Sequence, residues 1–338
     1  MRIGLAGGGT DLKEFYSNFG GLVVNVTIDM YVYARITPLD EGGVHFISHD
    51  TGEEIEFAGE EFHKTDGDLD FPENMPLFFS SYRKIMKLVG KLKPHRLETY
   101  SDSPVGSGLG TSSSLCVAII KAYDEWLNLG LSKVEIASMA YEVERIDCGF
   151  KGGLQDQFAA SFGGMNKIEI EKNGEVKVDR IESSDAFMRT LESMIILHYS
   201  GRSRESAEII SDQINAVGEK KKSLESMKIM KKLAERMVSS IERERFLEIA
   251  QIISESWEQK KNTSVKISNN EIDKVIHLAE KNGAISAKIS GAGGGGHILF
   301  IVPFESRKKF LRSLNYGTSS ARACNFTYGG AESWKMMG

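Results

Sequence analysis

The side chains best suited to catalysis are carboxylates that lie between residues 142 and 156. Glu142 and Glu144 are two residues apart on one predicted helix, so they point in different directions and only one of them can face a shared site, where it could hold a metal ion. The run Lys151-Gly-Gly-Leu-Gln-Asp156 then places an acidic residue after a glycine pair, as expected for a carboxylate that a loop presents to a cleft. Asp156 could instead cap a short helix over residues 157–161.

A glycine-rich segment, Ser103-Pro-Val-Gly-Ser-Gly-Leu-Gly-Thr-Ser-Ser-Ser114, joins a predicted strand to a predicted helix. Its glycines let successive backbone N–H groups turn inward beside the positive end of the helix, so the segment can hold nucleotide phosphates. The residues assigned to the nucleotide are Pro104, Gly106, Ser107, Gly108, Leu109, Gly110, Thr111, Ser112 and Ser113. Their hydroxyls suit phosphate oxygens or Mg²⁺, but at least one is expected only to cap the helix. No Gly-Lys-Ser/Thr follows the glycines, so this is not a Walker A loop, and a tight turn without a ligand is the alternative.

Two more glycine clusters can bring the backbone close to a ligand, and with the first they hold much of the total of 34 glycines. In Lys288-Ile-Ser-Gly-Ala-Gly-Gly-Gly-Gly-His297, the residues Gly291, Gly293 and Gly294 are candidates for close contact with a ligand. Four consecutive glycines are costly in conformational entropy, which disfavours the alternative of a flexible hairpin loop. From Arg2-Ile-Gly-Leu-Ala-Gly-Gly-Gly-Thr-Asp11 we assign Gly8, Gly9, Thr10 and Asp11 to a sugar. Asp11 could instead cap a helix over residues 12–19.

The composition excludes several classes of protein. A net charge of -5 and a pI near 5.9 disfavour nucleic acid as a partner, because the attraction to phosphate backbones is missing. There is no signal peptide and no apolar run near 18 residues, so we expect a cytoplasmic protein without a membrane partner. The three cysteines are far apart and show no CxxC pattern, which favours reduced thiols over disulfides or a metal site.

The elements that must position these loops follow one another in a mixed order. The predicted strands lie within residues 21–38, 44–48, 53–57, 95–100, 165–171, 175–181, 194–199, 284–289, 297–302 and 322–328. The predicted helices are 12–19, 75–93, 112–129, 132–148, 270–282 and 306–314, and residues 203–261 are expected to be almost entirely helical. Ser132-x-x-Glu135 is a capping-box pattern that opens the helix over residues 132–148. This order favours an α+β fold over a doubly wound sheet. The length of 338 residues suggests two domains, which we place at 1–185 and 186–338.

The four segments, in this order, resemble the GHMP kinase superfamily, which includes galactokinase, homoserine kinase, mevalonate kinase and phosphomevalonate kinase. Pro104-x-Gly-x-Gly-Leu-Gly-Thr-Ser-Ser is similar to the phosphate loop of that family, and Lys288-x-Ser-Gly-Ala-Gly-Gly-Gly-Gly is similar to its C-terminal motif. The resemblance implies that Gly291, Gly293 and Gly294 also bind the nucleotide. The resemblance spans essentially the whole chain. It implies a two-domain fold with an N-terminal domain like domain 2 of ribosomal protein S5 and a ferredoxin-like C-terminal domain.

The resemblance also implies an activity, namely transfer of the γ-phosphoryl group of ATP to a sugar hydroxyl with the help of Mg²⁺. Asp156 matches the position of the catalytic base, Glu144 matches the Mg²⁺ carboxylate, and Ser112 matches the loop hydroxyl on Mg²⁺. Arg2 would stabilise the transferring group or hold Asp156 ionised. Only Met1 precedes Arg2, where relatives have several residues that complete a strand, so we expect Arg2 to be weakly anchored.

Within the superfamily, three segments look most like the heptose 7-phosphate kinases, with fucokinase-type kinases close behind: Arg2 to Leu12, Gly20 to Asn25 and Tyr199 to Arg204. Gly8-Gly9 stands where galactokinases carry the Glu-His that recognises galactose, which argues against that sugar. The resemblance implies a small sugar-phosphate substrate, phosphorylated at the anomeric hydroxyl, that serves as a precursor of cell-surface polysaccharide. Arg202 and Arg204 are candidates for the phosphate of this substrate, and ordinary surface arginines are the alternative.

The sequence leaves other functions open. A fucokinase- or galactokinase-type enzyme and a small-alcohol kinase of the homoserine or mevalonate type use the same motifs. A non-catalytic sugar or nucleotide sensor on the same fold is a different class of function, although the acidic pair Glu144 and Asp156 argues against it. The oligomeric state is also open, and a homodimer is one of the options.

Overall fold

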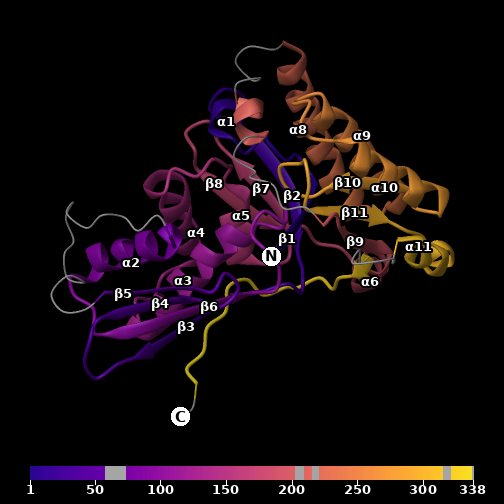
Figure 1. Cartoon of the computed structure of the whole chain (residues 1–338). Helices are drawn as coiled ribbons and strands as arrows, with labels where there is room; N and C mark the ends of the chain where they lie inside the picture. The colour runs from indigo at the N-terminus through magenta and orange to yellow at the C-terminus, as the bar shows by residue number, and fades with distance from the viewer. Residues whose placement is uncertain (58–73, 202–208, 215–220, 315–320, 337–338) are drawn as a thin grey trace.

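The computed structural model describes residues 1–57, 74–201, 209–214, 221–314 and 321–336, and Figure 1 shows the arrangement of the chain. Three four-stranded sheets lie side by side, with helices packed against them, so the α+β class expected from the sequence is confirmed. Arg202 and Arg204 lie outside the described residues. In the part of the chain that is described, no helix is long and apolar enough to cross a membrane.

The first sheet is antiparallel throughout and lies at the centre of the molecule (Figure 1). Its strand order is β1 (Arg2–Ala6), β2 (Gly21–Thr27), β7 (Met165–Ile170) and β8 (Val176–Arg180). Strand β2, with the sequence Gly-Leu-Val-Val-Asn-Val-Thr, is buried along its whole length. A run that is apolar at consecutive positions fits a strand that is covered on both faces. The short helix α1 (Lys13–Phe19) connects β1 to β2.

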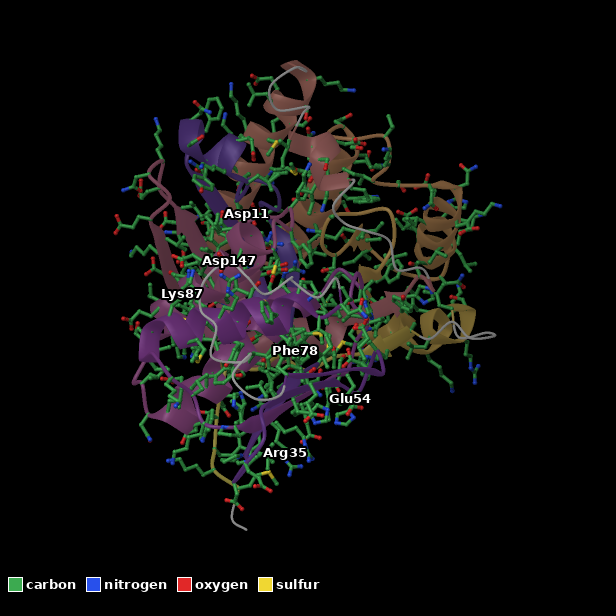
Figure 2. The ribbon with its side chains drawn as sticks, turned by 60° about the vertical axis from the view of Figure 1, so that its left-hand side comes forward. Asp11, Arg35, Glu54, Phe78, Lys87 and Asp147 are labelled. Atoms are coloured by element: carbon green, nitrogen blue, oxygen red, sulfur yellow. The ribbon has the colours of Figure 1, made fainter. Side chains whose placement is uncertain are left out.

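The second sheet has the order β3 (Val32–Pro38), β6 (His95–Ser101), β4 (Val44–Ser48) and β5 (Glu53–Phe57). Only β4 and β6 pair in parallel among these strands. Alternate residues of β4 and β6 are buried, which is the period-2 pattern of a sheet with one covered face. The cover consists of α2 (Pro76–Val89) and α3 (Thr111–Leu127). Figure 2 labels Arg35 and Glu54 on this sheet and Phe78 on α2.

The third sheet belongs to the C-terminal half of the chain and has the order β10 (Ser286–Ile289), β11 (His297–Ile301), β9 (Ile195–Tyr199) and β12 (Ala321–Ala323). The described helices of this half include α6 (Asp185–Met194), α8 (Lys221–Glu242), α9 (Phe246–Lys261), α10 (Asn270–Lys281) and α11 (Arg307–Leu314), with helical residues at 209–214 and the 3₁₀ turn Phe304–Ser306 before α11. The expected helical run over residues 203–261 is thus interrupted between α8 and α9. Glu244 breaks it with a φ of 57°, a conformation that a helix cannot contain.

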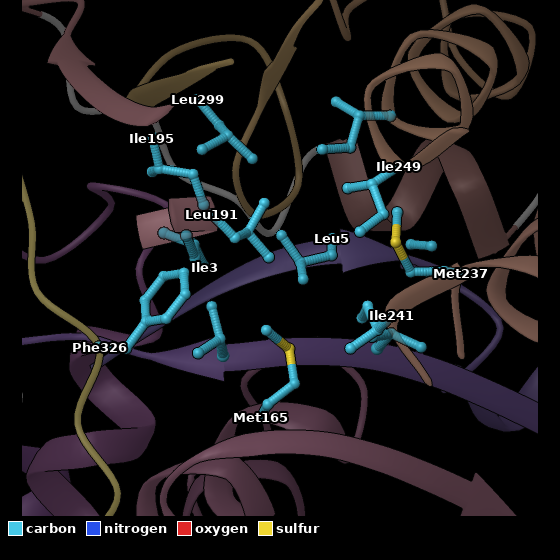
Figure 3. Packing of buried hydrophobic residues seen from close by; sticks show 14 of the residues in the cluster. Ile3, Leu5, Met165, Leu191, Ile195, Met237, Ile241, Ile249, Leu299 and Phe326 are labelled. Carbon is cyan, nitrogen blue, oxygen red and sulfur yellow. The ribbon is translucent and has the colours of Figure 1, made fainter. Parts of the chain in front are cut away.

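One hydrophobic core joins the first sheet to the C-terminal half, and Figure 3 shows part of it. Ile3 and Leu5 of β1 are fully buried in the same cluster as Met237 and Ile241 of α8 and Leu299 of β11. Transfer of a large apolar side chain from water to such a core stabilises a fold by about 1.5–3 kcal/mol. The two halves are therefore held together by shared apolar packing.

The end of the chain returns to the N-terminal half. The predicted strand 322–328 is wrong in its length: β12 ends at Ala323, and beyond it only Phe326 forms a bridge, with Ile28. The backbone then follows the end of β2, where the amide of Thr327 donates to Thr27 O (3.0 Å). The tail leaves the third sheet because its hydrogen-bond partners now belong to the first. The division of the chain at residue 185 stays a prediction, and this tail would cross it.

The acidic segment forms a helix whose last part is wound more widely than an α-helix. Helix α4 (Lys133–Tyr141) begins with the predicted capping box between Ser132 and Glu135, which is confirmed. From Glu142 to Asp147 the chain continues as a π-helix, η2, before the loop that leads to α5 (Gln155–Phe162). Such π-turns are often found at functional sites.

Candidate active site

The two glycine-rich loops assigned to the nucleotide are in direct backbone contact, although they are far apart in the sequence. The amide of His297 donates to Ser107 O (2.8 Å), and its ring Nδ1 lies 3.0 Å from the same oxygen. A Cβ at Gly291 would lie 2.6 Å from the Cα of Gly108, and one at Gly108 would lie 2.4 Å from Ser290 O. These distances require glycine at both positions, so the glycines let one loop rest on the other.

The start of α3 is not capped as the sequence suggests. Gly106, Gly108 and Gly110 all have positive φ values, of 79°, 81° and 75°, and Gly110 occupies the cap position. Among the described residues, no side chain caps this helix, so the expectation that at least one of its hydroxyls serves only as a cap is wrong. The free N–H groups of the first turn and the positive helix end remain available to an anion.

The hydroxyls of the first turn are instead directed to Glu144, which is fully buried. Ser112 Oγ donates to Glu144 Oε1 and Ser113 Oγ donates to Oε2, both at 2.6 Å. Gln157 Nε2 also donates to Oε2 (2.6 Å), and Arg145 Nη1 lies 3.2 Å from Oε1. Glu144 therefore connects the phosphate loop, the π-helix and the first turn of α5. Thr111 does not share this contact, because its hydroxyl lies 3.1 Å from Ser107 Oγ.

Glu142 points away from the buried site of Glu144, as the spacing of two residues predicts. Its side chain is half exposed and forms an ion pair with Lys84 on α2. The inference that only one of the two glutamates faces the site is confirmed, since Glu144 is buried and Glu142 is not. The π-helical turn contributes to this arrangement, because it directs Glu144 and Arg145 toward the phosphate loop and the glycine pair at residues 152 and 153.

Asp156 lies on the first turn of α5 and forms an ion pair with Arg2. Both Nε and Nη2 of Arg2 contact Asp156 Oδ1, at 2.7 and 2.6 Å. The second oxygen, Oδ2, faces the end of the phosphate loop, where a Cβ at Gly110 would be 3.3 Å from it. Among the described residues Leu154 occupies the cap position of α5 and no side chain caps it, so the capping alternative for Asp156 is wrong.

Arg2 is firmly held, contrary to the expectation from the short segment before it. Its side chain is 5% exposed, and Nη1 donates to Gly108 O (2.6 Å) and lies 3.4 Å from Ser290 Oγ. Its own amide donates to Leu109 O (3.1 Å), and the amino group of Met1 donates to Met30 O (2.7 Å). Arg2 thus contacts both glycine loops and Asp156 at once.

The loop after β1 places Asp11 near the charge of Asp156, and Figure 2 labels Asp11. Asp11 is buried and accepts hydrogen bonds from the amide of Gly9 (3.0 Å) and from Gln155 Nε2 (3.1 Å). Helix α1 has Leu12 at its cap position, so Asp11 does not cap it. Burial, and next the charge of Asp156, raise the pKa of the Asp11 carboxyl above its usual value. A Cβ at Gly153 would lie 1.9 Å from Asp11 Oδ2 and would collide with it, so only glycine fits at this position.

Thr10, Gly8 and Gly9, which are also assigned to a sugar, differ in how much space and how many free polar groups they present to a ligand. The hydroxyl of Thr10 is buried and bonded to the oxygens of Gly7 and Leu22, each at 2.8 Å, so it holds the loop to β2. Thr10 therefore supports the loop, and its assignment to the sugar stays a prediction. A Cβ at Gly8 would meet nothing within 4 Å, and one at Gly9 would meet only Met227, at 3.7 Å. The loop is therefore open at these two glycines.

Two buried lysines near the site were missed by sequence reasoning. Lys260, at the end of α9, donates to the carbonyl oxygen of Gly291, and Lys288 of β10 donates to Leu5 O (3.3 Å). Burial, and next the charge of Arg2, lower the pKa of Lys260 to about 8. Burial, followed by the charges of Lys260 and Arg2, lowers the pKa of Lys288 to about 7. Lys260 stands in a Glu-Gln-Lys-Lys run that is typical of a solvated helix face, so no local signal indicates its burial.

The groups around Glu144 fit a magnesium ion. Mg²⁺ prefers oxygen ligands and is held through one or two carboxylates together with substrate phosphates and water. Glu144 and the Ser112 hydroxyl supply a carboxylate and a hard oxygen next to the phosphate loop. The side-chain oxygen Oε1 of Gln157 is buried beside them without a hydrogen-bond partner in the described part of the chain, so a further polar group can be satisfied there.

Replacing Gly108 with alanine is expected to lower kcat at least tenfold and to destabilise the protein by about 2 kcal/mol or more, since a positive φ and a backbone clash act together. The added Cβ would lie 2.4 Å from Ser290 O and would separate the two loops. Gly52→Ala is the matched control, because Gly52 has a similar φ of 73° but open space around it. Steady-state kinetics and urea unfolding of both variants test this. Equal effects of the two changes would contradict it.

Comparisons with known proteins agree with this geometry. The profile of the GHMP kinases N terminal domain matches residues 77–164, and that of the GHMP kinases C terminal domain matches residues 237–317. A D-glycero-alpha-D-manno-heptose 7-phosphate kinase from Campylobacter jejuni is 39% identical over 99% of this chain and 97% of its own length. A mevalonate kinase from Pyrococcus abyssi is 27% identical over 86% of this chain and 85% of its own length.

Solved structures extend the likeness to three dimensions. The crystal structure of a D-glycero-D-manno-heptose 1-phosphate kinase from Bacteroides thetaiotaomicron superposes with a TM-score of 0.84 at 30% identity, covering 100% of this chain and 98% of that one. A Lactococcus lactis galactokinase, at 19% identity and a TM-score of 0.74, covers 97% and 92% of the two chains and shares the fold. The chain has the two-domain GHMP kinase fold and belongs to the GHMP kinase family.

Proposed function

We propose that this chain uses ATP and Mg²⁺ to phosphorylate D-glycero-D-manno-heptose 7-phosphate at its anomeric C1 hydroxyl. The product would be the 1,7-bisphosphate, a precursor of nucleotide-activated heptose for cell-surface polysaccharide, made in the cytoplasm where ATP is available. The observation that carries the proposal is the position of Asp156, which Arg2 holds at the point where both glycine loops meet. The names of the two heptose phosphate kinases among its relatives support the substrate class.

The geometry supports a division of labour among the residues. Phosphoryl transfer depends mainly on positioning and on neutralising charge. The N–H groups of the phosphate loop and of the first turn of α3 would hold the phosphates of ATP. Glu144 and Ser112 would hold Mg²⁺, which when bound neutralises negative charge on the phosphates. Asp156 would accept the proton of the attacking hydroxyl through Oδ2, since Oδ1 is bound to Arg2.

The sugar would enter from the side of Gly8 and Gly9. Open space at both positions allows an acceptor to approach the backbone closely, and the absence of side chains there removes the two groups that would recognise galactose. Asp11 could bind a sugar hydroxyl, because it lies next to Asp156 and is held by Gln155 and Gly9. Arg202 and Arg204 remain proposals for the 7-phosphate, and their positions are not described.

A substrate panel with coupled detection of ADP tests the proposed function. We expect saturable ADP release with heptose 7-phosphate, at a kcat/KM at least 100-fold above the values for fucose, galactose, mevalonate and homoserine. A preference for fucose or galactose would replace the heptose proposal by the corresponding sugar kinase. Nucleotide or sugar binding without any ADP release would indicate the sensor function instead and would refute the enzyme.

A further inference from the structure

Lys260 is a buried cation that lies in the active site without a negatively charged partner. It is 7% exposed, and its ammonium group donates to the carbonyl oxygen of Gly291. In the described part of the chain no carboxylate forms an ion pair with it. A buried ammonium is costly unless a negative group stabilises it, so its retention at this place points to an anion that binds there.

The carbonyl that Lys260 contacts belongs to the junction of the two glycine loops. Gly291 rests on Gly108 of the phosphate loop, and the preceding residue, Ser290, lies 3.4 Å from the guanidinium group of Arg2. Lys260 thus reaches the layer in which the phosphate loop, the C-terminal loop and Arg2 meet. It comes from the end of α9, whereas Arg2 comes from β1, so the two cations approach this layer from different halves of the chain.

The charges around this layer are unevenly balanced. Arg2 is paired with Asp156 and Arg145 is paired with Glu144, whereas no carboxylate of the described residues forms an ion pair with Lys260. The charged groups that face Lys260 are Arg2 of β1, Asp11 of the following loop, Asp156 of α5 and Lys288 of β10. Burial, and next the charge of Arg2, outweigh the two carboxylates, since the pKa of Lys260 is lowered to about 8. An incoming phosphoryl group would reverse this balance.

We propose that Lys260 is a catalytic residue that binds the transferred phosphoryl group, a role that rests on the proposed kinase function. In the reaction, the acceptor oxygen forms a bond to the γ-phosphorus while the bond from that phosphorus to the bridging oxygen breaks. ADP leaves with the electron pair of that bond, and the proton of the acceptor hydroxyl passes to Asp156. Lys260 leaves the Gly291 carbonyl and donates to an oxygen of the phosphoryl group in flight. A fixed cation there stabilises the transition state more than the ground state.

The first test is kinetic and uses three variants of the full chain. Lys260→Met is expected to lower kcat by about 100- to 1,000-fold with the KM for ATP and for the sugar phosphate each within about threefold. Lys260→Arg, which keeps a charge that does not titrate, should recover at least a tenth of the activity. Lys261→Met is the matched control, because Lys261 is the next residue but is partly exposed and paired with Glu258 (2.7 Å), and it should retain full activity.

The pH profile separates a chemical role from a structural one. Protonated Lys260 is the active form, so kcat/KM of the wild type should fall as the pH rises through about 8. In Lys260→Arg this fall should move up by at least one pH unit. An unchanged profile in the arginine variant, or a kcat of the methionine variant within threefold of the wild type, would overturn the proposal. A variant in which only the KM for the sugar phosphate rises would also overturn the proposal, because Lys260 would then bind the phosphate of the substrate.

A binding experiment gives an answer that does not depend on turnover. Mg²⁺, ADP and aluminium fluoride with the sugar phosphate mimic the phosphoryl group in flight, whereas Mg²⁺ and ADP alone do not. Calorimetry should show that Lys260→Met weakens the first complex by about 30-fold or more and the second by less than threefold; equal weakening would contradict the proposal. If the wild type is inactive with every acceptor, the proposed function fails. If it is active and only these contrasts are missing, Lys260 alone has been misassigned.

Discussion

The variant Asp156→Asn is expected to lower kcat by about 1,000-fold, because a positioned general base contributes about 10²–10⁴ to the rate of proton transfer. The amide keeps the shape of the side chain but cannot accept the proton of the attacking hydroxyl. It also leaves Arg2 without the charge that now meets it at 2.6 and 2.7 Å. The measurement is the steady-state rate of ADP release, together with nucleotide affinity by calorimetry, which should stay within about threefold of the wild type.

Asp147→Asn is the control for this change. Asp147 is exposed at the end of η2, in the same acidic segment, and Figure 2 labels it, so its replacement should leave kcat unaltered. Asp156→Glu adds a second comparison, because it keeps the charge but moves it by one methylene group, and we expect partial activity. Full activity of Asp156→Asn would exclude Asp156 as the base while leaving the kinase assignment in place.

The variant Glu144→Gln should affect both stability and activity. Removing one partner from a buried ion pair typically costs about 3–5 kcal/mol, since the remaining charge is left buried and unpaired. Here that charge is Arg145, and Ser112 and Ser113 would also lose a charged acceptor for their hydroxyls. We expect a loss of about 3 kcal/mol in the free energy of unfolding, measured in urea. The Mg²⁺ concentration that gives half-maximal rate should rise at least tenfold.

Glu142→Gln is a close control, because it removes the same charge two residues earlier on the same helical turn. Glu142 is half exposed and pairs with Lys84, so its loss should cost about 1 kcal/mol or less. Ser112→Ala separates the two effects of Glu144, since it removes a proposed Mg²⁺ ligand without leaving a buried charge. A Glu144→Gln protein with wild-type stability and an unaltered Mg²⁺ dependence would refute both the structural and the metal role.

Much of the fold and the position of the site could be predicted from local patterns. The glycine clusters and the spacing of the two glutamates are local features, and helix geometry alone is enough to separate Glu142 from Glu144. The capping box at Ser132 is equally local and was predicted correctly. What these features have in common is that the physical cause lies within a few residues of the effect.

Other features depend on contacts between distant segments. Ser112 and Ser113 bond to Glu144 rather than to their own helix, because a buried carboxylate arrives from another element. Lys260 and Lys261 are adjacent in the sequence, yet Lys260 is buried and Lys261 is partly exposed, and the packing of α9 against the Gly291 loop decides which of them is buried. The anchoring of Arg2 depends on the two glycine loops in the same way.

The shared core of β1 has a consequence for how the protein is made. Ile3 and Leu5 leave the ribosome long before their packing partners Met237, Ile241 and Leu299, which are synthesised more than 230 residues later. One face of the first sheet therefore stays exposed to water until α8 and α9 have emerged. Partly synthesised chains with uncovered apolar strands tend to aggregate, and contacts of long sequence separation slow folding. The nascent N-terminal half should need chaperone protection, and folding should finish only after release.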